Sequence, residues 1–590
     1  MTATRLHYRV DLTQPWSHCF KVAVTIRDWQ DESLLLCLPV WTPGSYLVRE
    51  YSRHLQEFRA ETTDGLPLPW RKVRKNHWQI EGTRGKTVVV RFSMLATELT
   101  VRTNHLDSTH GFFTPAALLP YVPELRHQSC EVEIVAPEPW QAFTALPVLT
   151  QSPGEPVVPH RFQADNYDHL VDSPFEIGPL EVHHFEAAGK PHRWVTWGQG
   201  PVRYEQLLAD TRRIIEMEAA LFGGLPYDNY LFILHLSGGA YGGLEHRDST
   251  VLAYDRHGLA EPESYPRFLQ LVAHEFFHLW NVKRLRPQAL EEFDYDRENY
   301  APSLWFCEGV TSYYDPLLPL RAGCYGVEFF LDGLGKDLSR YLTTPGRQIQ
   351  PLTESSFDAW IKLYRRDAWS DNQQMSYYLK GQLVTMLLDL EIQRHQPERC
   401  FDDVLRRLWQ THGQPERGYR EDELRRLISD VAGVNLEAFF AAYLDGLEEL
   451  PLGEALARVG LTLAPSLQPH PFHGLRVADE GGRCRVKFVA AGSPAAVAGL
   501  EPGDELLALD GFRISVDSLP KRLKRYQPGD RLGLTLFHGD ELVNRRLTLA
   551  EPQPASWGLT PNPEATVEQR QAFRRWTGCD LPGQSGGDRQ

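Results

Sequence analysis

Hydrophobic and polar positions alternate in short runs along the first third of the chain. Pro, Gly and Asp bound these runs, and such a pattern predicts β-strands. The predicted strands are Leu6–Leu12, His18–Arg27, Ser33–Leu38, Thr87–Leu95 and Cys130–Ala136. Because no long helical periodicity accompanies them, residues 1–185 are expected to form a β-rich domain, similar to a sandwich.

After residue 186 the hydrophobic period lengthens to that of helices. Strands are still expected at Tyr230–Leu236 and Ser249–Tyr254, on either side of a glycine-rich loop. Helices are predicted at Tyr204–Leu221, Leu269–Pro287, Ser303–Tyr314, Tyr377–Arg394, Phe401–Gln410, Arg420–Val431 and Leu436–Leu444. Residues 186–452 are therefore expected to form a second domain with a mixed β lobe and a helical lobe.

The pattern changes again near residue 453. Residues 453–552 carry β-type runs, two Pro-Gly-Asp turns and a short helix near Ser518–Tyr526. The remaining residues, 553–590, are rich in Pro, Gly and Gln, with one helix predicted near Val567–Trp576 and a frayed end after it. The whole chain is predicted to be a multidomain α+β protein.

Composition narrows the class of protein. The 590 residues are 42% hydrophobic and 24% charged, as in ordinary globular domains. A net charge of −15 argues against nucleic acid and anionic membranes as general partners. No apolar run is long enough to cross a bilayer, and MTATRLHYRVDL lacks the pattern of a signal peptide. The eight cysteines are scattered, without a C-x-x-C pair, so a cytoplasmic protein with reduced thiols is expected.

The helix at Leu269–Pro287 carries the strongest candidate chemistry. His274 and His278 are four residues apart, so both imidazoles lie on one helix face and could bind one Zn²⁺. Glu275 could reach a water at that metal and act as general base. The alternative is a structural helix whose histidines bind no metal. Because the helix is apolar nearly all round, buried histidines there would need partners.

A His-x-x-x-His pair needs a third ligand to leave one position open for water. Glu308 lies on the next predicted helix, among apolar and aromatic neighbours, and is the candidate. The alternative is a glutamate on the surface of that helix. Tyr378 lies at the start of another helix, where its hydroxyl could point into a cleft.

The glycine-rich stretch Ser237–His246 could bind a substrate. Gly242 and Gly243 would let the backbone approach a ligand closely, and a strand edge there could pair with a peptide. Glu245 is placed to hold a positive charge, although a glycine turn with a solvated glutamate fits equally. Near the turn at Pro43-Gly44, Tyr46 and Arg49 could reach the active site, but packing and a domain interface are favoured.

These motifs together resemble the M61 family of zinc peptidases, the glycyl aminopeptidases with a PDZ domain. The segments that carry the resemblance are HEFFHLWNVKRLRP (His274–Pro287), WFCEGVTSYY (Trp305–Tyr314), YGGLEH (Tyr241–His246), WTPGSYLVREY (Trp41–Tyr51) and, for the PDZ domain, GSPAAVAGLEPGDELLALDG (Gly492–Gly511). The resemblance implies a thermolysin-like (gluzincin) zinc peptidase at residues 186–452 and a PDZ domain at 453–552.

The resemblance also implies roles for individual residues. One Zn²⁺ per chain would be held by His274, His278 and Glu308, with Glu275 as general base. Tyr378 would donate a hydrogen bond to the developing oxyanion, and Tyr377 is the adjacent alternative. Small N-terminal residues such as Gly or Ala would be removed from peptides.

A more distant likeness to the M1 aminopeptidases concerns two segments. Their G-x-M-E-N loop resembles Gly242–His246, which implies that Glu245 binds the substrate α-ammonium, and their Y-x-K-G segment resembles Tyr378–Gly381. His246 stands where the usual residue is Asn, so its substrate contacts are open. The acidic connector between the two ligand helices is long, so Asp294, Asp296 and Glu298 remain alternative ligands.

Other functions stay open on the sequence alone. The same zinc chemistry without terminus selection would give a thermolysin-type endopeptidase, and a PDZ-bearing scaffold with an inactive protease domain is a third reading. The PDZ-like segment could bind a peptide C-terminus, with its groove at Gly474, Leu475, Arg476 and Val477. It could equally pack against the catalytic domain for stability or substrate gating.

Overall fold

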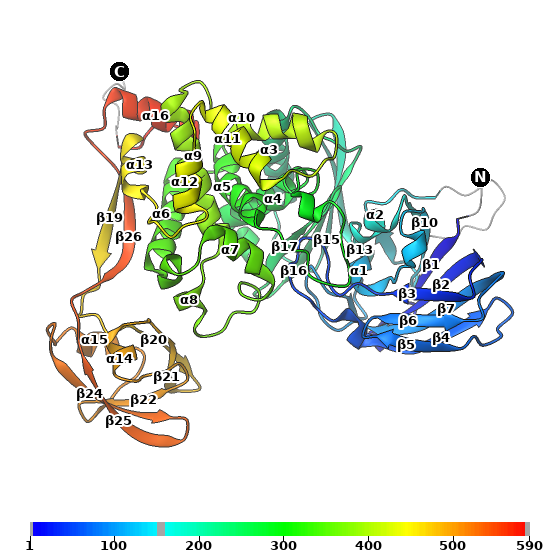
Figure 1. Cartoon of the computed structure of the whole chain (residues 1–590), viewed down its shortest axis with the longest axis horizontal. Helices are drawn as coiled ribbons and strands as arrows, with labels where there is room; N and C mark the ends of the chain where they lie inside the picture. The colour runs from blue at the N-terminus through cyan, green and yellow to red at the C-terminus, as the bar shows by residue number, and fades with distance from the viewer. Residues whose placement is uncertain (1–3, 150–159, 584–590) are drawn as a thin grey trace. The chain divides into compact units, whose positions relative to one another are not determined.

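A computed structural model describes residues 4–149 and 160–583 (Figure 1). The chain forms two compact units. One comprises Met1–Tyr300, Tyr314–Cys324 and Leu405–Arg420, and the other Ala301–Tyr313, Tyr325–Val404 and Glu421–Gln590.

The first unit begins with the β-rich region that the alternating runs predicted. A six-stranded sheet has the order β12-β10-β1-β2-β7-β4, and beside it are a three-stranded sheet, β3-β6-β5, and a four-stranded sheet, β11-β13-β9-β8. The strands are β1 (Leu6–Asp11), β2 (Cys19–Trp29), β3 (Ser33–Cys37), β4 (Leu55–Thr62), β5 (Trp70–Arg74), β6 (His77–Glu81), β7 (Lys86–Leu95), β8 (His105–Leu106), β9 (Gly111–Phe113), β10 (Cys130–Val135), β11 (Gln141–Phe143), β12 (Arg161–Ala164) and β13 (Phe175–Gly178).

Alternation explains how these strands share a core. Every second residue of β1 and β10 is buried, as expected where one face of a sheet packs and the other is wetter. The inward residues of the six-stranded and three-stranded sheets, among them Tyr8, Val24, Leu36 and Trp78, belong to one hydrophobic cluster. The predicted β-rich N-terminal domain is confirmed.

A five-stranded sheet of order β14-β15-β16-β18-β17 follows in the same unit. Its strands are β14 (Glu181–Ala187), β15 (Lys190–Trp197), β16 (Tyr230–Ser237), β17 (Tyr241–Glu245) and β18 (Ser249–Asp255). β16 runs parallel to β15 and β18, and all but its last residue are buried, which explains its mostly apolar sequence. The glycine-rich stretch, expected to be a loop, instead pairs from Tyr241 onward as the edge strand β17, antiparallel to β18.

Helices α3 (Tyr204–Phe222) and α4 (Tyr265–Phe277) pack on each other, and α4 also packs against β17 and β18. The helix α4 starts at Tyr265, with Ser264 at its N-cap and Pro266 in its first turn, and it does not continue to the predicted end at Pro287. It ends at Phe277, with His278 still in helical conformation at the cap. The chain then folds into turns. Arg284 lies after these turns and donates to the Leu279 carbonyl at 2.9 Å.

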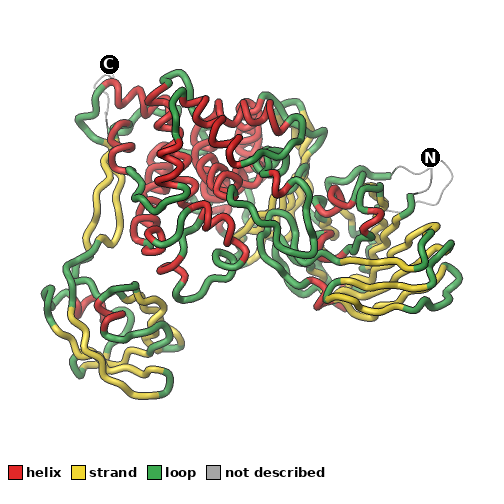
Figure 2. Tube along the Cα trace, viewed as in Figure 1, coloured by secondary structure: helices red, strands yellow, loops and turns green. Residues whose placement is uncertain are grey.

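Helices are red in Figure 2, and most of those described belong to the second unit. They include α6 (Val327–Thr343), α7 (Leu352–Phe357), α9 (Tyr377–His395), α11 (Glu421–Ala432), α12 (Glu437–Tyr443) and α13 (Leu452–Arg458). The helix predicted at Ser303–Tyr314 begins as a π-helical turn, Trp305–Gly309, and continues as α5 (Val310–Arg321). This helix extends beyond the predicted end at Tyr314, and Pro316 lies inside it although proline removes a backbone hydrogen bond.

The C-terminal β region has its own sheet and core. Its sheet order is β20-β21-β22-β24-β25, with β23 beside β22. The strands are β20 (Leu475–Glu480), β21 (Arg483–Val489), β22 (Glu505–Leu509), β23 (Phe512–Arg513), β24 (Arg531–His538) and β25 (Glu541–Thr548). A separate hydrophobic cluster includes Val486, Leu506 and Leu534, and α15 (Ser518–Leu523) packs on it through Leu519.

For residues 553–590 the predicted helix near Val567–Trp576 is confirmed, whereas a strand before it was not predicted. Pro554–Pro561 form β26, which pairs with β19 (Leu461–Leu467). Val567–Thr577 form α16, whose Trp576 is fully buried and donates from Nε1 to the Tyr313 hydroxyl at 2.9 Å. Only residues 584–590 of the expected frayed end lie outside the described part.

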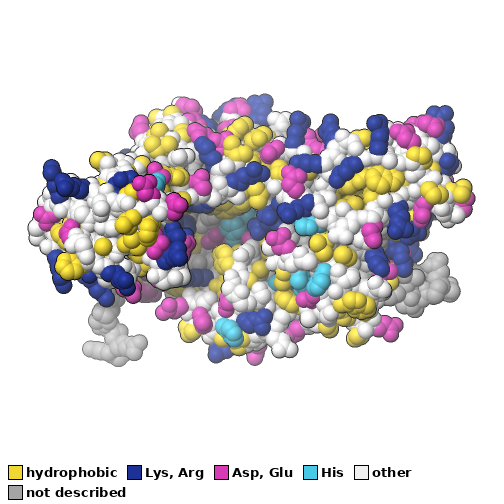
Figure 3. All heavy atoms as spheres, turned by 90° about the horizontal axis from the view of Figure 1, so that it is seen from below, with side chains coloured by type: hydrophobic (Ala, Val, Ile, Leu, Met, Phe, Trp, Pro, Cys, Tyr) yellow, Lys and Arg dark blue, Asp and Glu magenta, His cyan; other side chains and the backbone are white. Residues whose placement is uncertain are grey.

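The surface carries both signs of charge. On the face drawn in Figure 3, Lys and Arg side chains are interspersed with Asp and Glu. No helix within residues 4–149 and 160–583 has the length and apolar character needed to span a bilayer.

Candidate active site

The two histidines of α4 face each other. The Nε2 atoms of His274 and His278 are 3.1 Å apart, and the rings cross at 87°. Each Nδ1 has a partner on its other side: Asp315 Oδ2 at 2.8 Å for His274, and the Asn281 carbonyl at 2.6 Å for His278. An imidazole whose Nδ1–H donates to an oxygen presents its Nε2 lone pair, so two lone pairs converge here.

Glu275 lies beside these rings and is nearly fully buried. Its burial raises the pKa to about 7, against the opposing attraction of His274 and His278. One of its oxygens, Oε2, has no hydrogen-bond partner among the described residues. A buried, basic carboxylate with a free oxygen is suited to accept a proton.

The edge strand β17 passes directly over Glu275. A Cβ atom built on Gly243 would overlap the Glu275 carboxylate, whereas the nearest atom to a Cβ on Gly242 is Arg102 Nη1, 3.9 Å away. The two adjacent glycines therefore serve different purposes. Gly243 lets the strand backbone approach the acidic side chain, and this explains why the strand carries no side chain there.

Glu245 ends the same strand on the same side. Its carboxylate, that of Glu275 and a ring nitrogen of His278 lie within 4.8 Å of one another, and Glu245 is 3% exposed. The turn at Pro43-Gly44 approaches it from the N-terminal domain: Gly44 has φ of +87°, and a Cβ there would overlap the Glu245 carboxylate. The alternative of a solvated glutamate is therefore wrong, because two backbone segments cover this side chain.

A cavity of about 430 Å³ opens beside Glu245. Trp41, Gly44 and Tyr46 line it from the N-terminal domain, and Lys283 lines it from the segment after α4. Arg49 does not line this cavity; it donates to Ser45 Oγ at 3.1 Å. Tyr46 thus lies near the site, whereas Arg49 holds the turn.

His246, expected to touch substrate, is buried and turned toward Asp172, with its Nδ1 3.1 Å from Oδ1. Lys283 also donates to that oxygen, at 2.7 Å, and the Arg247 amide donates to Oδ2 at 2.8 Å. These bonds and the nearby cation keep the pKa of Asp172 far below its usual range despite its burial. His246 therefore helps to hold the end of β17 in place.

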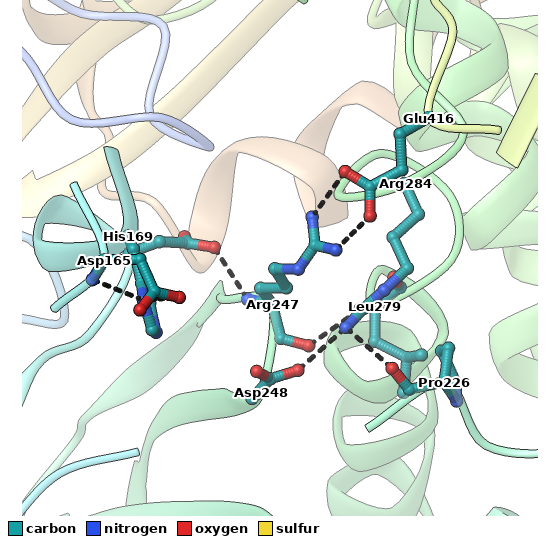
Figure 4. A network of polar contacts seen from close by, with 9 residues as sticks. Asp165, His169, Pro226, Arg247, Asp248, Leu279, Arg284 and Glu416 are labelled. Carbon is teal, nitrogen blue, oxygen red and sulfur yellow. Dashed lines mark hydrogen bonds and ion pairs between the residues drawn. The ribbon is translucent and has the colours of Figure 1, made fainter. Parts of the chain in front are cut away.

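The basic residues after α4 hold the same region (Figure 4). Arg284 donates to the carbonyls of Arg247 and Leu279, both at 2.9 Å, and to Asp248 Oδ1 at 2.8 Å. Arg247 in turn pairs with Glu416. One buried guanidinium thus joins the turn between β17 and β18 to the segment that follows His278.

Two residues near the histidines carried no recognisable signal in the sequence. Arg102, from a loop of the N-terminal domain, donates to the Gly243 carbonyl at 2.9 Å, and its charge lowers the pKa of Glu275 against the effect of burial. Glu218 of α3 is fully buried near His274 and Asp315, and burial raises its pKa well above its usual value. Neither belongs to a spaced motif, so only the fold could identify them.

Glu308 and Tyr378 belong to the second unit. Glu308 is buried in the π-helical turn. Burial raises the pKa of Tyr378 far above its usual value, and the charge of Glu308 raises it further. The Tyr364 hydroxyl lies 2.9 Å from the Tyr378 hydroxyl and 3.4 Å from the hydroxyl of the fully buried Tyr377. Tyr364 was not identified from the sequence.

Paired glycines fix the distance between those two helical segments. A Cβ on Gly381 of α9 would lie 2.9 Å from the Gly309 Cα and 2.9 Å from the Trp305 carbonyl oxygen. The backbones therefore touch where the two helices cross. This contact explains why a glycine follows Glu308 directly, and why another lies three residues after Tyr378.

The alternative acidic ligands are engaged elsewhere. Asp296 accepts from Asn76 at 2.8 Å and contacts His77 Nε2, while Asp294 pairs with Arg297 and its backbone carbonyl accepts from Trp41 at 2.8 Å. These contacts tie the connector to the N-terminal β domain.

Comparison with known proteins identifies the family. Family models match two parts of the chain: the peptidase M61 N-terminal domain over residues 7–179, and the M61 glycyl aminopeptidase domain over residues 267–384. The crystal structure of an aminopeptidase N family protein from Idiomarina loihiensis is 32% identical, covers 97% of this chain and 100% of its own, and superposes with a TM-score of 0.90. The chain belongs to the M61 glycyl aminopeptidase family. It is thus an enzyme, a zinc metallopeptidase.

Other solved structures are far less similar to this M61 chain. An M1 zinc metallopeptidase from Deinococcus radiodurans is 14% identical over 76% of this chain and 94% of its own, with a TM-score of 0.49. Yeast LTA4 hydrolase is 13% identical over 77% and 70%, with a TM-score of 0.46. No curated protein matches the chain.

The histidine pair fits the zinc that the M61 family implies. Two Nε2 atoms at 3.1 Å, each with its Nδ1 oriented by an oxygen, form half of a tetrahedral nitrogen–oxygen ligand set. Glu275 beside them supplies the carboxylate that the chemistry requires without needing to be a ligand.

Proposed function

We propose that this protein hydrolyses the N-terminal residue from peptides with a free amino group. One zinc ion would be held by His274, His278 and Glu308. When bound, zinc acts as a Lewis acid toward the scissile carbonyl and makes water a stronger nucleophile. The observation that carries the proposal is the buried Glu275, which lies between the paired imidazoles and the edge strand β17.

Glu308 as third ligand is supported by its position along the helix. Asp315 lies seven residues, or about two turns, after Glu308 on one continuous helical segment, so both carboxylates lie on the same face. Asp315 accepts from His274 at 2.8 Å. Glu308 is therefore proposed as the third ligand because it shares a helix face with Asp315.

The remaining groups would act on the substrate directly. Glu275 would take a proton from the attacking water and pass it to the leaving amine. The Tyr378 hydroxyl would donate to the oxyanion, a contribution of about 2.7–4 kcal/mol for a single donor. Tyr378 is favoured over Tyr377 because Tyr377 is fully buried, whereas Tyr378 is only partly so and is influenced by Glu308.

Glu245 would bind the substrate α-ammonium, and the backbone of Gly242 and Gly243 would lie along the substrate. Two carboxylates so close together at a water-poor site favour a cation between them. Removal of small residues such as Gly or Ala is what membership of the M61 glycyl aminopeptidase family implies. His246 would contribute only through Asp172 and the position of β17.

The general base is tested by Glu275→Gln. Because the amide cannot accept the proton, hydrolysis of aminoacyl substrates should fall by about 10²–10⁴-fold. Zinc content, measured by mass spectrometry of the purified protein, should match the wild type. Glu216→Gln, at an exposed position of α3, is the control and should leave both unchanged. Near-normal turnover in Glu275→Gln would reject the assignment.

Terminus selection is tested with paired substrates. The wild type should cleave a free peptide but not its N-acetylated form, because the blocked amine has no charge for Glu245 to hold. Glu245→Ala should lose most activity on the free peptide. Equal cleavage of both peptides by the wild type would instead indicate a thermolysin-type endopeptidase, and no cleavage by a zinc-loaded protein would indicate an inactive scaffold.

We further propose that the C-terminal β region is a PDZ domain that binds a peptide C-terminus at Gly474, Leu475, Arg476 and Val477. These residues open the edge strand β20, next to a cavity of about 840 Å³ that Phe472 and His473 also line. The domain is also held by contacts to the helices, since Asn372 Nδ2 donates to the Val489 carbonyl at 2.8 Å.

The eight free cysteines of the chain support the cytoplasm as the location of the protein.

A further inference from the structure

A second group of metal-ligating side chains lies in the first unit, apart from α4. His105 at the start of β8, Asp107 in the following turn and His110 before β9 each offer a ligand atom within 4.8 Å of the others. His105 Nε2 is 3.3 Å from Asp107 Oδ2. The rings of His105 and His110 are 4.9 Å apart.

His110 is the best-defined member of this group. It is fully buried, and its Nδ1 lies 2.7 Å from Glu176 Oε1 on β13. Its other nitrogen, Nε2, is buried and has no hydrogen-bond partner in the described part of the chain. A buried imidazole whose Nδ1–H donates to a carboxylate, and whose Nε2 faces no protein donor, has the orientation of a metal ligand.

The rest of the surroundings hold His110 rigidly. Glu176 is itself fixed, since its second oxygen lies 2.7 Å from His235 Nε2 on β16. Trp197 stacks on the His110 ring with centroids 3.9 Å apart. Because both Glu176 oxygens are already engaged by imidazoles, Glu176 orients a ligand and is not one itself.

Asp107 is arranged in the same way. Its Oδ1 accepts from the Thr109 amide at 2.7 Å and the Thr109 hydroxyl at 2.6 Å, which leaves Oδ2 toward His105. The side chains of Asp107 and His105 are 30% and 14% exposed, so an ion can enter from solvent. Two imidazoles and one carboxylate with a solvent-facing side match the preferences of zinc and chemically similar divalent ions.

We infer that His105, Asp107 and His110 form a second divalent-cation site, selective for zinc-like ions, which joins the β8–β9 turn to the sheets that carry Glu176 and His235. Its ligands come from the N-terminal domain and their support from both sheets, so the ion stabilises the junction between them. This site does not depend on the peptidase activity proposed above.

Metal stoichiometry of the full-length protein tests the inference. After saturation with zinc and desalting, the wild type should retain two zinc ions per chain. Asp107→Asn, which keeps the side-chain shape and the bonds to Thr109, should retain one, as should His105→Gln. His183→Gln is the control: His183 is a partly exposed histidine paired with Glu181 at 3.0 Å, and its loss should leave two.

Cobalt separates this site from the one on α4. In His274→Gln/His278→Gln, one Co²⁺ should still bind, with visible d–d absorption and a raised thermal midpoint, and adding Asp107→Asn should abolish both. Retention of a single zinc by the wild type would overturn the inference, as would two zinc ions in both Asp107→Asn and His105→Gln. Loss of peptidase activity in any variant bears only on the α4 site.

Discussion

Gly243 shows most directly why the active site requires a particular residue type. It gives β17 its approach to Glu275, while its neighbour Gly242 faces open space apart from the end of Arg102. Two glycines that look alike in the sequence therefore differ in what their hydrogen atoms contact. The effect of adding one Cβ atom at Gly243 can be measured by substitution with alanine.

Gly243→Ala should displace either β17 or the Glu275 carboxylate, because the new Cβ would overlap Glu275 Oε1. We expect kcat/KM on aminoacyl substrates to fall by at least about 10²-fold, since a misplacement of about 1 Å at a catalytic group has that effect. Gly453→Ala, in the helix α13 with no heavy atom within 4 Å of the new Cβ, is the control and should keep activity within a few-fold of the wild type. Equal effects of the two substitutions on activity would show that β17 does not lie over Glu275.

The residue scale also separates what the sequence could predict from what it could not. His274, Glu275 and His278 stand at a spacing that only a helix converts into one face, so their arrangement was predictable. Arg102 lies 141 residues from the Gly243 carbonyl that it binds, and nothing local marks it. His246 was assigned to substrate by its place in the motif, but its ring turns to Asp172, a partner that also lies far away in the sequence.

At the scale of elements, the crossing of α9 with the π-helical turn determines where Glu308 and Tyr378 lie relative to each other. Gly309 and Gly381 allow the two backbones to touch. The sequence predicted both helices but not their contact. Two helix ends were also predicted wrongly. The helix α5 continues past Pro316, and α4 gives way after His278 to turns that Arg284 stabilises.

Gly381→Ala should separate the two helices, since its Cβ would lie 2.9 Å from the Gly309 Cα. The expected result is a lower thermal midpoint together with weaker zinc retention. Gly333→Ala, in the helix α6 with no heavy atom within 4 Å of the new Cβ, is the matched control. It should be neutral or stabilise the protein by up to about 1 kcal/mol, as replacement of a helical glycine by alanine does. A stable, zinc-retaining Gly381→Ala would refute a tight crossing.

At the scale of the whole molecule, the end of the chain returns to the helices. β26 pairs with β19, and α16 inserts Trp576 beside Phe330 and the Tyr313 hydroxyl. Tyr313 also donates to Asp389 of α9, so the last helix is bonded to the two segments that carry Glu308 and Tyr378. The sequence predicted the helix at the end of this segment but not the strand β26 before it, because Pro and Gly are abundant there; Pro is nevertheless compatible with a strand at the edge of a sheet.

Trp576→Ala should destabilise the protein by about 3–5 kcal/mol, because it removes a fully buried indole and its hydrogen bond. Thermal or denaturant unfolding followed by circular dichroism measures this change. Val567→Ala, at a position 65% exposed on the same helix, should change stability by no more than about 0.5 kcal/mol. Equal stability of the two variants would mean that the C-terminal helix is not part of the folded unit.

The sequence by itself determined the elements and the residue types that can do zinc chemistry. Alternation and helical periodicity act between near neighbours, so strands such as β1 and β10, the helix α9 and the HEFFH spacing could all be read from the chain. Only the tertiary structure decided that Gly243 covers Glu275, that Arg102 and Asp172 hold the edge strand, that a histidine–aspartate cluster forms around His110, and that the C-terminal helix is buried. Those contacts join residues distant in the sequence, and a contact between distant residues leaves no periodic trace in either of the segments that make it.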